Sequence, residues 1–136
     1  MAIYRFGVVD STQRTARVLA LDPSTIGDRV VALGQTGGRG QHQHEWASPL
    51  GGLYLSLIRR APPVAAAVVP LALGVGLAEL LERRWSVPAR VRWPNDVVAG
   101  RPEDPSRKIS GILVDGLEMN TPRARLVIGI GVNVAS

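Results

Sequence analysis

The sequence predicts an α+β fold, in which one mixed β-sheet carries its helices mainly on one face. Two observations lead to this prediction. Segments with strand character outnumber the helical ones, and several of them are separated only by turns of hairpin length. No internal repeat or linker interrupts this pattern, so we expect residues 1–136 to form a single domain.

The first half of the chain predicts three strands, one helix and one loop. IYRFGVV, residues 3–9, has strand character, and the following DST can cap a helix that runs to about Asp22. RVVALGQ, residues 29–35, is typical of a short buried strand. The glycine-rich stretch after it predicts a loop, and the period-two alternation of residues 53–60, LYLSLIRR, predicts another strand.

Residues 64–81, VAAAVVPLALGVGLAELL, are the most apolar segment, and their length raises the question of a membrane span. Pro70, Glu79 and the arginine pairs on both sides argue against insertion. Much of the hydrophobicity comes from alanine, which inserts weakly. We therefore predict a buried helix that packs on the sheet.

The last part of the chain predicts the remaining strands, which are ARVRW, VVAG, RKISGILVDGLEM and RARLVIGIGVNVA. The turn WPND separates the first two, and the polar loop GRPEDPSR joins the second to the third. The turn NTP precedes the last strand, whose apolar run indicates burial.

Composition limits the classes of protein that fit. The 136 residues are 46% hydrophobic, which supports a core, and the absence of cysteine excludes disulfides and thiol nucleophiles and fits a reducing compartment. The N-terminus has no secretory signal pattern, so we expect a cytoplasmic protein. The net charge is +5, but the arginines are scattered and aromatic residues are few, which disfavours nucleic-acid binding as a primary role.

The glycine-rich stretch GGRGQHQHEW, Gly37 to Trp46, has three interpretations from its residues alone. Its glycines let backbone N–H groups approach an anion, and Arg39 can bind phosphate or carboxylate bidentately. His42 and His44 could supply two metal ligands, but a third ligand at a telling spacing is missing from the sequence. The stretch could also be a solvated polar turn.

Other polar motifs each have a structural and a functional interpretation. WPND, residues 93–96, is either a turn that satisfies its own backbone or a polar edge for a nucleotide and magnesium. Lys108, the sole lysine among 16 basic residues, is either a solvated edge residue or a compact cation for a phosphate or carboxylate. DST is either only a helix cap or a binding site, in which its hydroxyls accept hydrogen bonds and the N-terminus of the helix binds an anion.

Taken together and in order, the motifs resemble one family. The series DST, GQTGGRG with a following tryptophan and SP, LYLSL, RWPND, RKISGIL and IGIGVNV is similar to the catalytic domain of biotin protein ligases, within the biotin/lipoate ligase superfamily. The resemblance runs from about Val8 to Val134. It implies an enzyme that joins biotin to ATP with Mg²⁺, forming biotinyl-5′-AMP, and then passes the biotinyl group to a lysine of a biotin carboxyl carrier protein.

The resemblance also implies roles for individual residues. Lys108 and Arg39 would act in catalysis, with Lys108 binding the biotin carboxylate and the α-phosphate. The biotin-binding residues would be Ser11, Thr12, Gln13, Gln35, Arg39, Gly40, Gln41, Lys108 and Gly111. Trp46, Asn95 and Asn133 would line the ATP site, and Asp96 would bind Mg²⁺.

The sequence departs from the family pattern in the glycine-rich loop. The family loop usually reads GRGRxGRxW, so Gln41 and His44 stand where arginines are common and Gln43 where glycine is. Without these two arginines the loop should bind phosphates less tightly, and without the glycine its backbone has fewer allowed conformations. Gln13 also stands where asparagine is usual. We expect a slower or leakier enzyme.

Two segments that are absent from this sequence limit the function that we expect. No helix-turn-helix precedes the domain in this sequence, so we expect no DNA binding and no repressor role. The sequence stops after IGIGVNVAS, where family members continue into further segments and a β-barrel, so we expect a short ligase or a fragment.

The residues alone leave two alternative functions open. One is a degenerate relative that binds biotin with little or no turnover. The other is a lipoyl or octanoyl transferase, which WPND and the GRG after QT disfavour. We expect no membrane partner, and the sequence leaves open whether the chain forms a homodimer.

Overall fold

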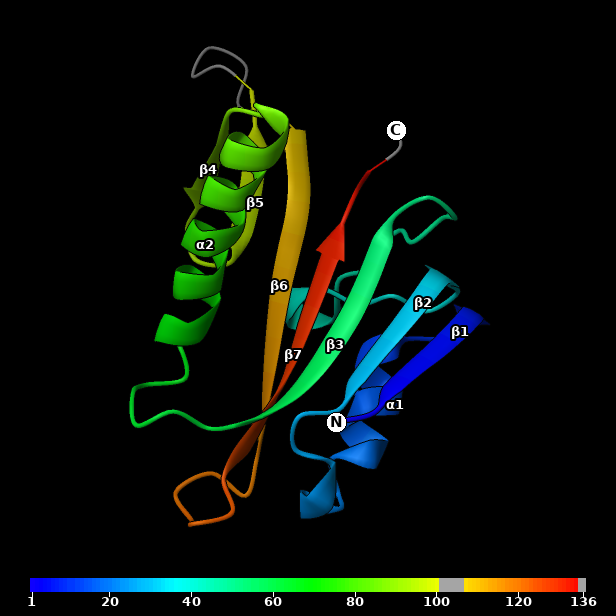
Figure 1. Cartoon of the computed structure of the whole chain (residues 1–136), viewed down its shortest axis with the longest axis vertical. Coiled ribbons are helices and arrows are strands. Elements are labelled where there is room, and N and C mark those ends of the chain that lie inside the picture. Colours follow the sequence, from blue (N-terminus) through cyan, green and yellow to red (C-terminus); the bar gives the residue numbers. More distant parts are fainter. Residues whose placement is uncertain (101–106, 135–136) are drawn as a thin grey trace.

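Residues 1–100 and 107–134, which the computed structural model describes, form one seven-stranded sheet with an α-helix on each side (Figure 1). The strands are β1 (Ile3–Val9), β2 (Arg29–Gln35), β3 (Leu53–Arg60), β4 (Ala89–Arg92), β5 (Asp96–Ala99), β6 (Arg107–Leu117) and β7 (Arg125–Val132). The helices are α1 (Thr12–Leu19) and α2 (Val68–Trp85), and Pro23–Thr25 and Gln41–Gln43 are short 3₁₀ turns.

The strand order in the sheet is β1-β2-β3-β7-β6-β5-β4. β1 and β2 run parallel because α1 returns the chain between them, and every other neighbouring pair is antiparallel. The predicted α+β class and single mixed sheet are confirmed. The strands lie where the sequence predicts them, whereas the predicted loop GRPEDPSR falls largely on residues 101–106, outside the described part.

The expectation that the helices gather mainly on one face is wrong, because α1 and α2 lie on opposite faces of the sheet (Figure 1). Successive residues of a strand point to opposite faces. In β7, Val127 packs in the core cluster with Ala16 of α1, whereas Ile128 packs in a second cluster with Leu73 of α2. The continuous apolar run of β7 reflects burial on both faces.

α2 lies on the sheet as predicted, with both ends shifted along the chain. The prediction that it is buried is wrong, because only the side that meets the sheet is covered: Pro70, Gly74 and Ala78 are buried, whereas Val75 and Leu80 are exposed. The helix packs against β4, β5 and β6. It ends where Ser86 takes a left-handed conformation and donates its backbone N–H to the Glu82 carbonyl. In the described part of the chain, no helix combines the length and apolar character that a membrane crossing needs.

Two glycines of α2 offer a matched test of this packing. Gly76 has open space around a hypothetical Cβ, so Gly76→Ala should raise the free energy of unfolding by about 1 kcal/mol through helix propensity alone. At Gly74 the same Cβ would lie 3.3 Å from Val91, so Gly74→Ala should gain less or lose stability. Urea denaturation of both variants measures the difference. Equal gains would contradict the packing of α2 on β4.

The buried Arg125 holds the C-terminal end of α1 in place. Its guanidinium donates to the carbonyl oxygens of Ala20 and Leu21, just beyond the C-terminal end of the helix, and pairs with Glu118. This hydrogen bond from Arg125 holds the pKa of the Glu118 carboxyl below its usual value. Because the C-terminal end of α1 is anchored to β7, its N-terminal end is held over the sheet, where the pocket lies.

Candidate active site

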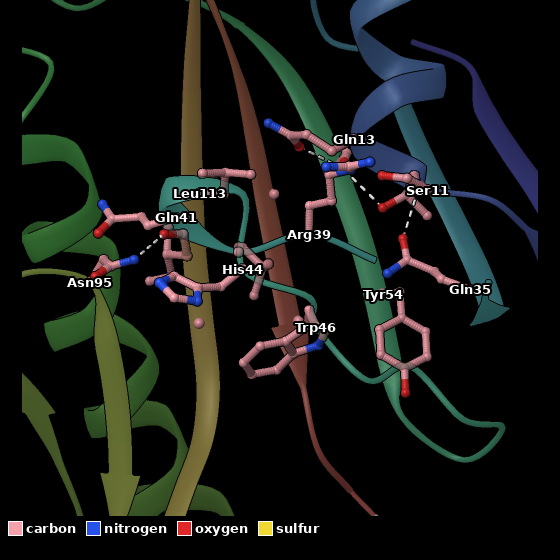
Figure 2. A pocket seen from close by; sticks show the side chains of 18 of the residues that line it. Ser11, Gln13, Gln35, Arg39, Gln41, His44, Trp46, Tyr54, Asn95 and Leu113 are labelled. Atoms are coloured by element: carbon pink, nitrogen blue, oxygen red, sulfur yellow. Dashed lines mark hydrogen bonds between the residues drawn. The ribbon is translucent and has the colours of Figure 1, made fainter. Parts of the chain in front are cut away.

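A pocket with a volume of about 270 Å³ lies between the N-terminal end of α1, the glycine-rich loop and strands β3, β6 and β7 (Figure 2). All but one of the residues expected at the biotin, ATP and metal sites line it, namely Ser11, Thr12, Gln13, Gln35, Arg39, Gly40, Gln41, Trp46, Asn95, Asp96, Lys108 and Gly111. The exception is Asn133, whose backbone N–H donates to the Ile109 carbonyl at 2.8 Å and whose side chain donates to the Lys108 carbonyl at 3.4 Å.

The start of α1 forms one end of the pocket. Ser11 is the N-cap, and its hydroxyl accepts from the backbone N–H of Arg14 at 3.3 Å. The backbone N–H of Thr12 donates to Gln35 Oε1 at 2.7 Å. Gln35 in turn donates to Ser48 Oγ at 2.9 Å, which joins this end of the pocket to the segment after the loop. Figure 2 shows Ser11, Gln13 and Gln35 gathered here, with Asn95 at the opposite end.

Gln13 reaches across the sheet because its side chain is one methylene longer than the usual asparagine. Its Nε2 donates to Asp115 Oδ2 and to the Val127 carbonyl, each at 2.9 Å, and its Oε1 accepts from Ser56 Oγ at 2.9 Å. A Cβ on Gly129 would lie 2.5 Å from Gln13 Oε1. The glycine therefore leaves the space that Gln13 occupies.

Gly111 and Gly131 form a flat backbone platform under Trp46. The two glycines are direct partners in the β6–β7 ladder and present the same face of the sheet. A Cβ on Gly131 would lie 2.7 Å from Nε1 of the Trp46 indole, and one on Gly111 would lie 3.2 Å from its Cζ3. The indole can approach the strands this closely only because both side chains are absent.

Lys108 lies at the edge of this platform and contacts groups from two other elements. Its Nζ is 2.9 Å from Asp96 Oδ1 and 4.8 Å from the centroid of the Trp46 ring, within the range of a cation–π interaction. Arg92 binds the other oxygen of Asp96 at 3.0 Å. The carboxylate of Asp96 thus holds the ammonium of Lys108 inside the pocket.

Asn95 is largely buried and is bound to β6. Its Nδ2 donates to the Ile112 carbonyl at 2.9 Å, and the backbone N–H of Ile112 donates back to the Asn95 carbonyl at 3.0 Å. These two bonds hold the WPND turn beside Lys108. The side chain of Asn95 therefore has a structural role in holding this turn against β6.

The glycine-rich loop folds as a narrow hairpin over the pocket. Arg39 and Glu45 form a β-bridge, Gly40 donates to the His44 carbonyl at 2.7 Å, and Arg39 donates to Gln43 Oε1 at 2.9 Å. His42 and His44 both line the pocket. Within residues 1–100 and 107–134, no three acidic or histidine side chains gather in a group that could hold a metal ion.

The loop departs from the family pattern at a strained position. Gln43 stands where the family pattern has glycine, and its φ is 64°, in the left-handed region that favours glycine. Gln43→Gly should therefore raise the free energy of unfolding by about 1 kcal/mol, measured by urea denaturation. Gln41 is not among the positive-φ residues of the described part, so Gln41→Gly is the matched control and should not stabilise. Gln43→Gly also removes the exposed hydrogen bond from Arg39, so a loss of stability larger than that of one exposed hydrogen bond would contradict this backbone conformation.

Sequence reasoning missed several lining residues, and some of them had a signal. Ser56 is a polar residue at an alternating position of LYLSLIRR, and Gly129 and Gly131 alternate along one face of β7. Tyr54 also lines the pocket and donates to the Pro49 carbonyl at 2.7 Å. Burial raises the pKa of its phenol above the ordinary value.

Known proteins are similar to this chain in sequence and in fold. The chain is 38% identical over 112 residues to the bifunctional ligase/repressor BirA of Escherichia coli, a match that covers 80% of this chain and 33% of that protein. The structure of this chain resembles that of the biotin protein ligase of Aquifex aeolicus in complex with biotin and ATP. The TM-score is 0.79, and the identity is 33% over 99% of this chain and 53% of that one.

The biotin protein ligase of Leishmania major in complex with biotinyl-5-AMP is similar as well, with a TM-score of 0.77 and 26% identity over 99% of this chain and 58% of that one. The chain thus spans between about a third and three fifths of the length of these relatives. The model of the biotin/lipoate A/B protein ligase family matches residues 6–133. This match covers nearly the whole chain, which therefore belongs to the biotin/lipoate A/B protein ligase family.

Proposed function

We propose that this domain binds biotin and ATP, joins them as biotinyl-5′-AMP with release of pyrophosphate, and then passes the biotinyl group to a lysine of a biotin carboxyl carrier protein. The observation that carries the proposal is the place of Lys108. Its ammonium lies in the same pocket as the polar end built by α1 and Gln35. The similar proteins from A. aeolicus and L. major, which bind biotin with ATP and biotinyl-5-AMP, support this substrate pair.

In this proposal the two substrates occupy opposite ends of the pocket. Ser11, Thr12, Gln13 and Gln35 would bind the polar ring of biotin, and its aliphatic chain would run along the pocket past Trp46 toward Lys108. Arg39, Gly40 and Gln41 would cover the ligands from the loop. Trp46, Asn95 and Asn133 would border the nucleotide, since all three lie close to Lys108 or to the strands beside it.

Lys108 would bring the two anions together. During adenylation, a carboxylate oxygen of biotin attacks the α-phosphorus of ATP, a new P–O bond forms, and the bond to pyrophosphate breaks. A compact cation between carboxylate and α-phosphate offsets their repulsion and stabilises the charge on the phosphoryl oxygens. The contacts of Lys108 with Asp96 and Trp46 orient its ammonium before the substrates arrive. Arg39 would stabilise the same charge from the loop.

Asp96 would hold Mg²⁺ together with the phosphates of ATP. Magnesium usually takes one or two protein carboxylates and completes its shell with phosphate oxygens and water. Asp96 supplies a single carboxylate of this kind, and Mg²⁺ would share its oxygens with Lys108 and Arg92. The ion would supply positive charge to the triphosphate.

The test is incubation of the chain with biotin, ATP, Mg²⁺ and a biotin carboxyl carrier domain. Pyrophosphate release and a biotinylated carrier would support the full reaction. Calorimetric binding of biotin without either product would favour a binding-only relative, for which the strained backbone at Gln43 is the physical argument. Products formed with lipoate in place of biotin would favour a lipoyl transferase.

A further inference from the structure

We propose that Asp115 is a positioning residue that sets the hydrogen-bond polarity of one wall of the pocket, and thereby selects a ligand ring that carries N–H donors. This inference rests on the proposed binding of biotin. The wall consists of the side chains of Thr12, Gln13 and Ser56, which all line the pocket and are less than a tenth exposed. We call it the polar wall.

The amide of Gln13 can adopt only one orientation. Its nitrogen Nε2 faces Asp115 Oδ2 and the Val127 carbonyl, each at 2.9 Å, and both of these groups only accept hydrogen bonds. Flipping the amide would place Gln13 Oε1 against two acceptors, which is unfavourable. Oε1 therefore faces Ser56.

This orientation determines the direction of the remaining hydrogen bonds in the polar wall. Ser56 must donate its one hydroxyl hydrogen to Gln13 Oε1, at 2.9 Å. Because that hydrogen is used, Thr12 Oγ1 must be the donor to Ser56 Oγ, at 3.0 Å. Every polar side-chain hydrogen of the three residues is then donated within the protein. What Thr12 and Gln13 can offer to a ligand is lone pairs.

A wall of buried acceptors selects its ligand by chemistry. A ring that brings N–H groups satisfies these lone pairs, whereas a ring without donors leaves them buried and unpaired, at a cost in affinity. The ureido ring of biotin has two N–H groups. A dithiolane ring, as in lipoate, has none.

Asp115 acts on this wall from outside the pocket. It is on β6, and Val127, its direct ladder partner on β7, supplies the second acceptor for Gln13. Its carboxylate is also 4.0 Å from Nε of Arg17 on α1. Asp115 therefore touches Gln13 rather than the ligand, and its effect on specificity passes through the orientation of one amide.

The test compares biotin with its cyclic-carbonate analogue, in which oxygen atoms replace both ureido N–H groups. Calorimetry gives the ratio of the two dissociation constants for the unaltered chain and for Asp115→Ala. Without Asp115, the amide of Gln13 is freer to turn its Nε2 into the pocket. We expect the preference for biotin to fall about tenfold, the size of one lost hydrogen bond.

Two control variants separate polarity from charge and packing. Asp115→Asn keeps an acceptor oxygen for Gln13 and should restore most of the preference. Arg17→Ala removes the ion pair but leaves the carboxylate, so it should keep the wild-type ratio. In ¹⁵N NMR spectra, the two Nε2 hydrogens of Gln13 should exchange slowly in the unaltered chain and faster in Asp115→Ala.

An Asp115→Ala variant with an unchanged ratio, or an unaltered chain whose Gln13 amide exchanges like a free one, would overturn the role of Asp115 while leaving biotin binding intact. If the unaltered chain binds no biotin, the proposed function fails and this inference fails with it.

Discussion

Lys108→Arg should leave the fold intact and slow the formation of biotinyl-5′-AMP by about a hundredfold or more, the usual effect of displacing a charge that stabilises the transition state. The space around Lys108 explains why arginine, although also a cation, cannot replace the lysine in adenylation. A Cβ on Gly111 would lie 3.4 Å from Cε and 3.5 Å from Nζ of Lys108, so the lysine end lies directly over the backbone of the platform. The larger planar guanidinium would fill the space that the two substrate anions need.

Asp96 strengthens this expectation. A guanidinium binds a carboxylate bidentately, so arginine at position 108 would pair with Asp96 more firmly than lysine does at 2.9 Å. It would also stack on the indole of Trp46. Both contacts hold the charge away from the α-phosphate while preserving the local structure.

The measurement is pyrophosphate release from biotin and ATP, alongside thermal denaturation to confirm folding. Arg107→Ala is the control, since Arg107 is the exposed neighbour on the opposite face of β6 and should keep the wild-type rate. A wild-type rate of adenylation in Lys108→Arg would refute the role of the lysine.

Gly131→Ala should weaken biotin binding by roughly ten- to a hundredfold. The added methyl group overpacks the platform at a cost of about 1–3 kcal/mol and pushes the indole of Trp46 into the pocket that biotin would occupy. The methyl carbon would lie 2.7 Å from Nε1 and 3.0 Å from Cε2 of Trp46, so the indole would have to lift from the sheet. The backbone itself tolerates alanine. Positive φ among the described glycines occurs at Gly27, Gly51 and Gly100, and Gly131 is an ordinary strand residue.

Gly7→Ala is the matched control, since Gly7 is also a strand glycine and a Cβ there meets nothing within 4 Å. It should leave biotin affinity unchanged. Calorimetric titration of biotin measures both variants, and the fluorescence of Trp46 should change in Gly131→Ala. Undiminished affinity in that variant would show that the ligand does not depend on the glycine platform.

Much of the fold could be predicted because its signals are local. The alternation in LYLSLIRR and the apolar run of RLVIGIGV each specify a strand within a few residues, and the DST sequence specifies where α1 begins. The helix at 64–81 was harder to delimit. Its end depends on the left-handed conformation of Ser86, which no periodicity reveals.

The candidate site was predicted through motifs rather than through geometry. Motif order was enough to bring together Ser11, Gln35 and Lys108 as residues of one pocket, since each belongs to a recognisable segment. Asp115 and Ser56 belong to no motif. Their importance comes from contacts with Gln13, which is 102 residues from Asp115 and 43 from Ser56 along the chain.

Local sequence therefore specified the α+β class, the order of the elements and the family resemblance, because helices, strands and motifs depend on neighbouring residues. Tertiary structure decided that α1 and α2 take opposite faces, that Gly111 lies opposite Gly131, and that Asp115 orients Gln13. Each of these depends on which strands become neighbours. That choice is made by the burial of the whole sheet, which brings together residues whose local sequences carry no sign of one another.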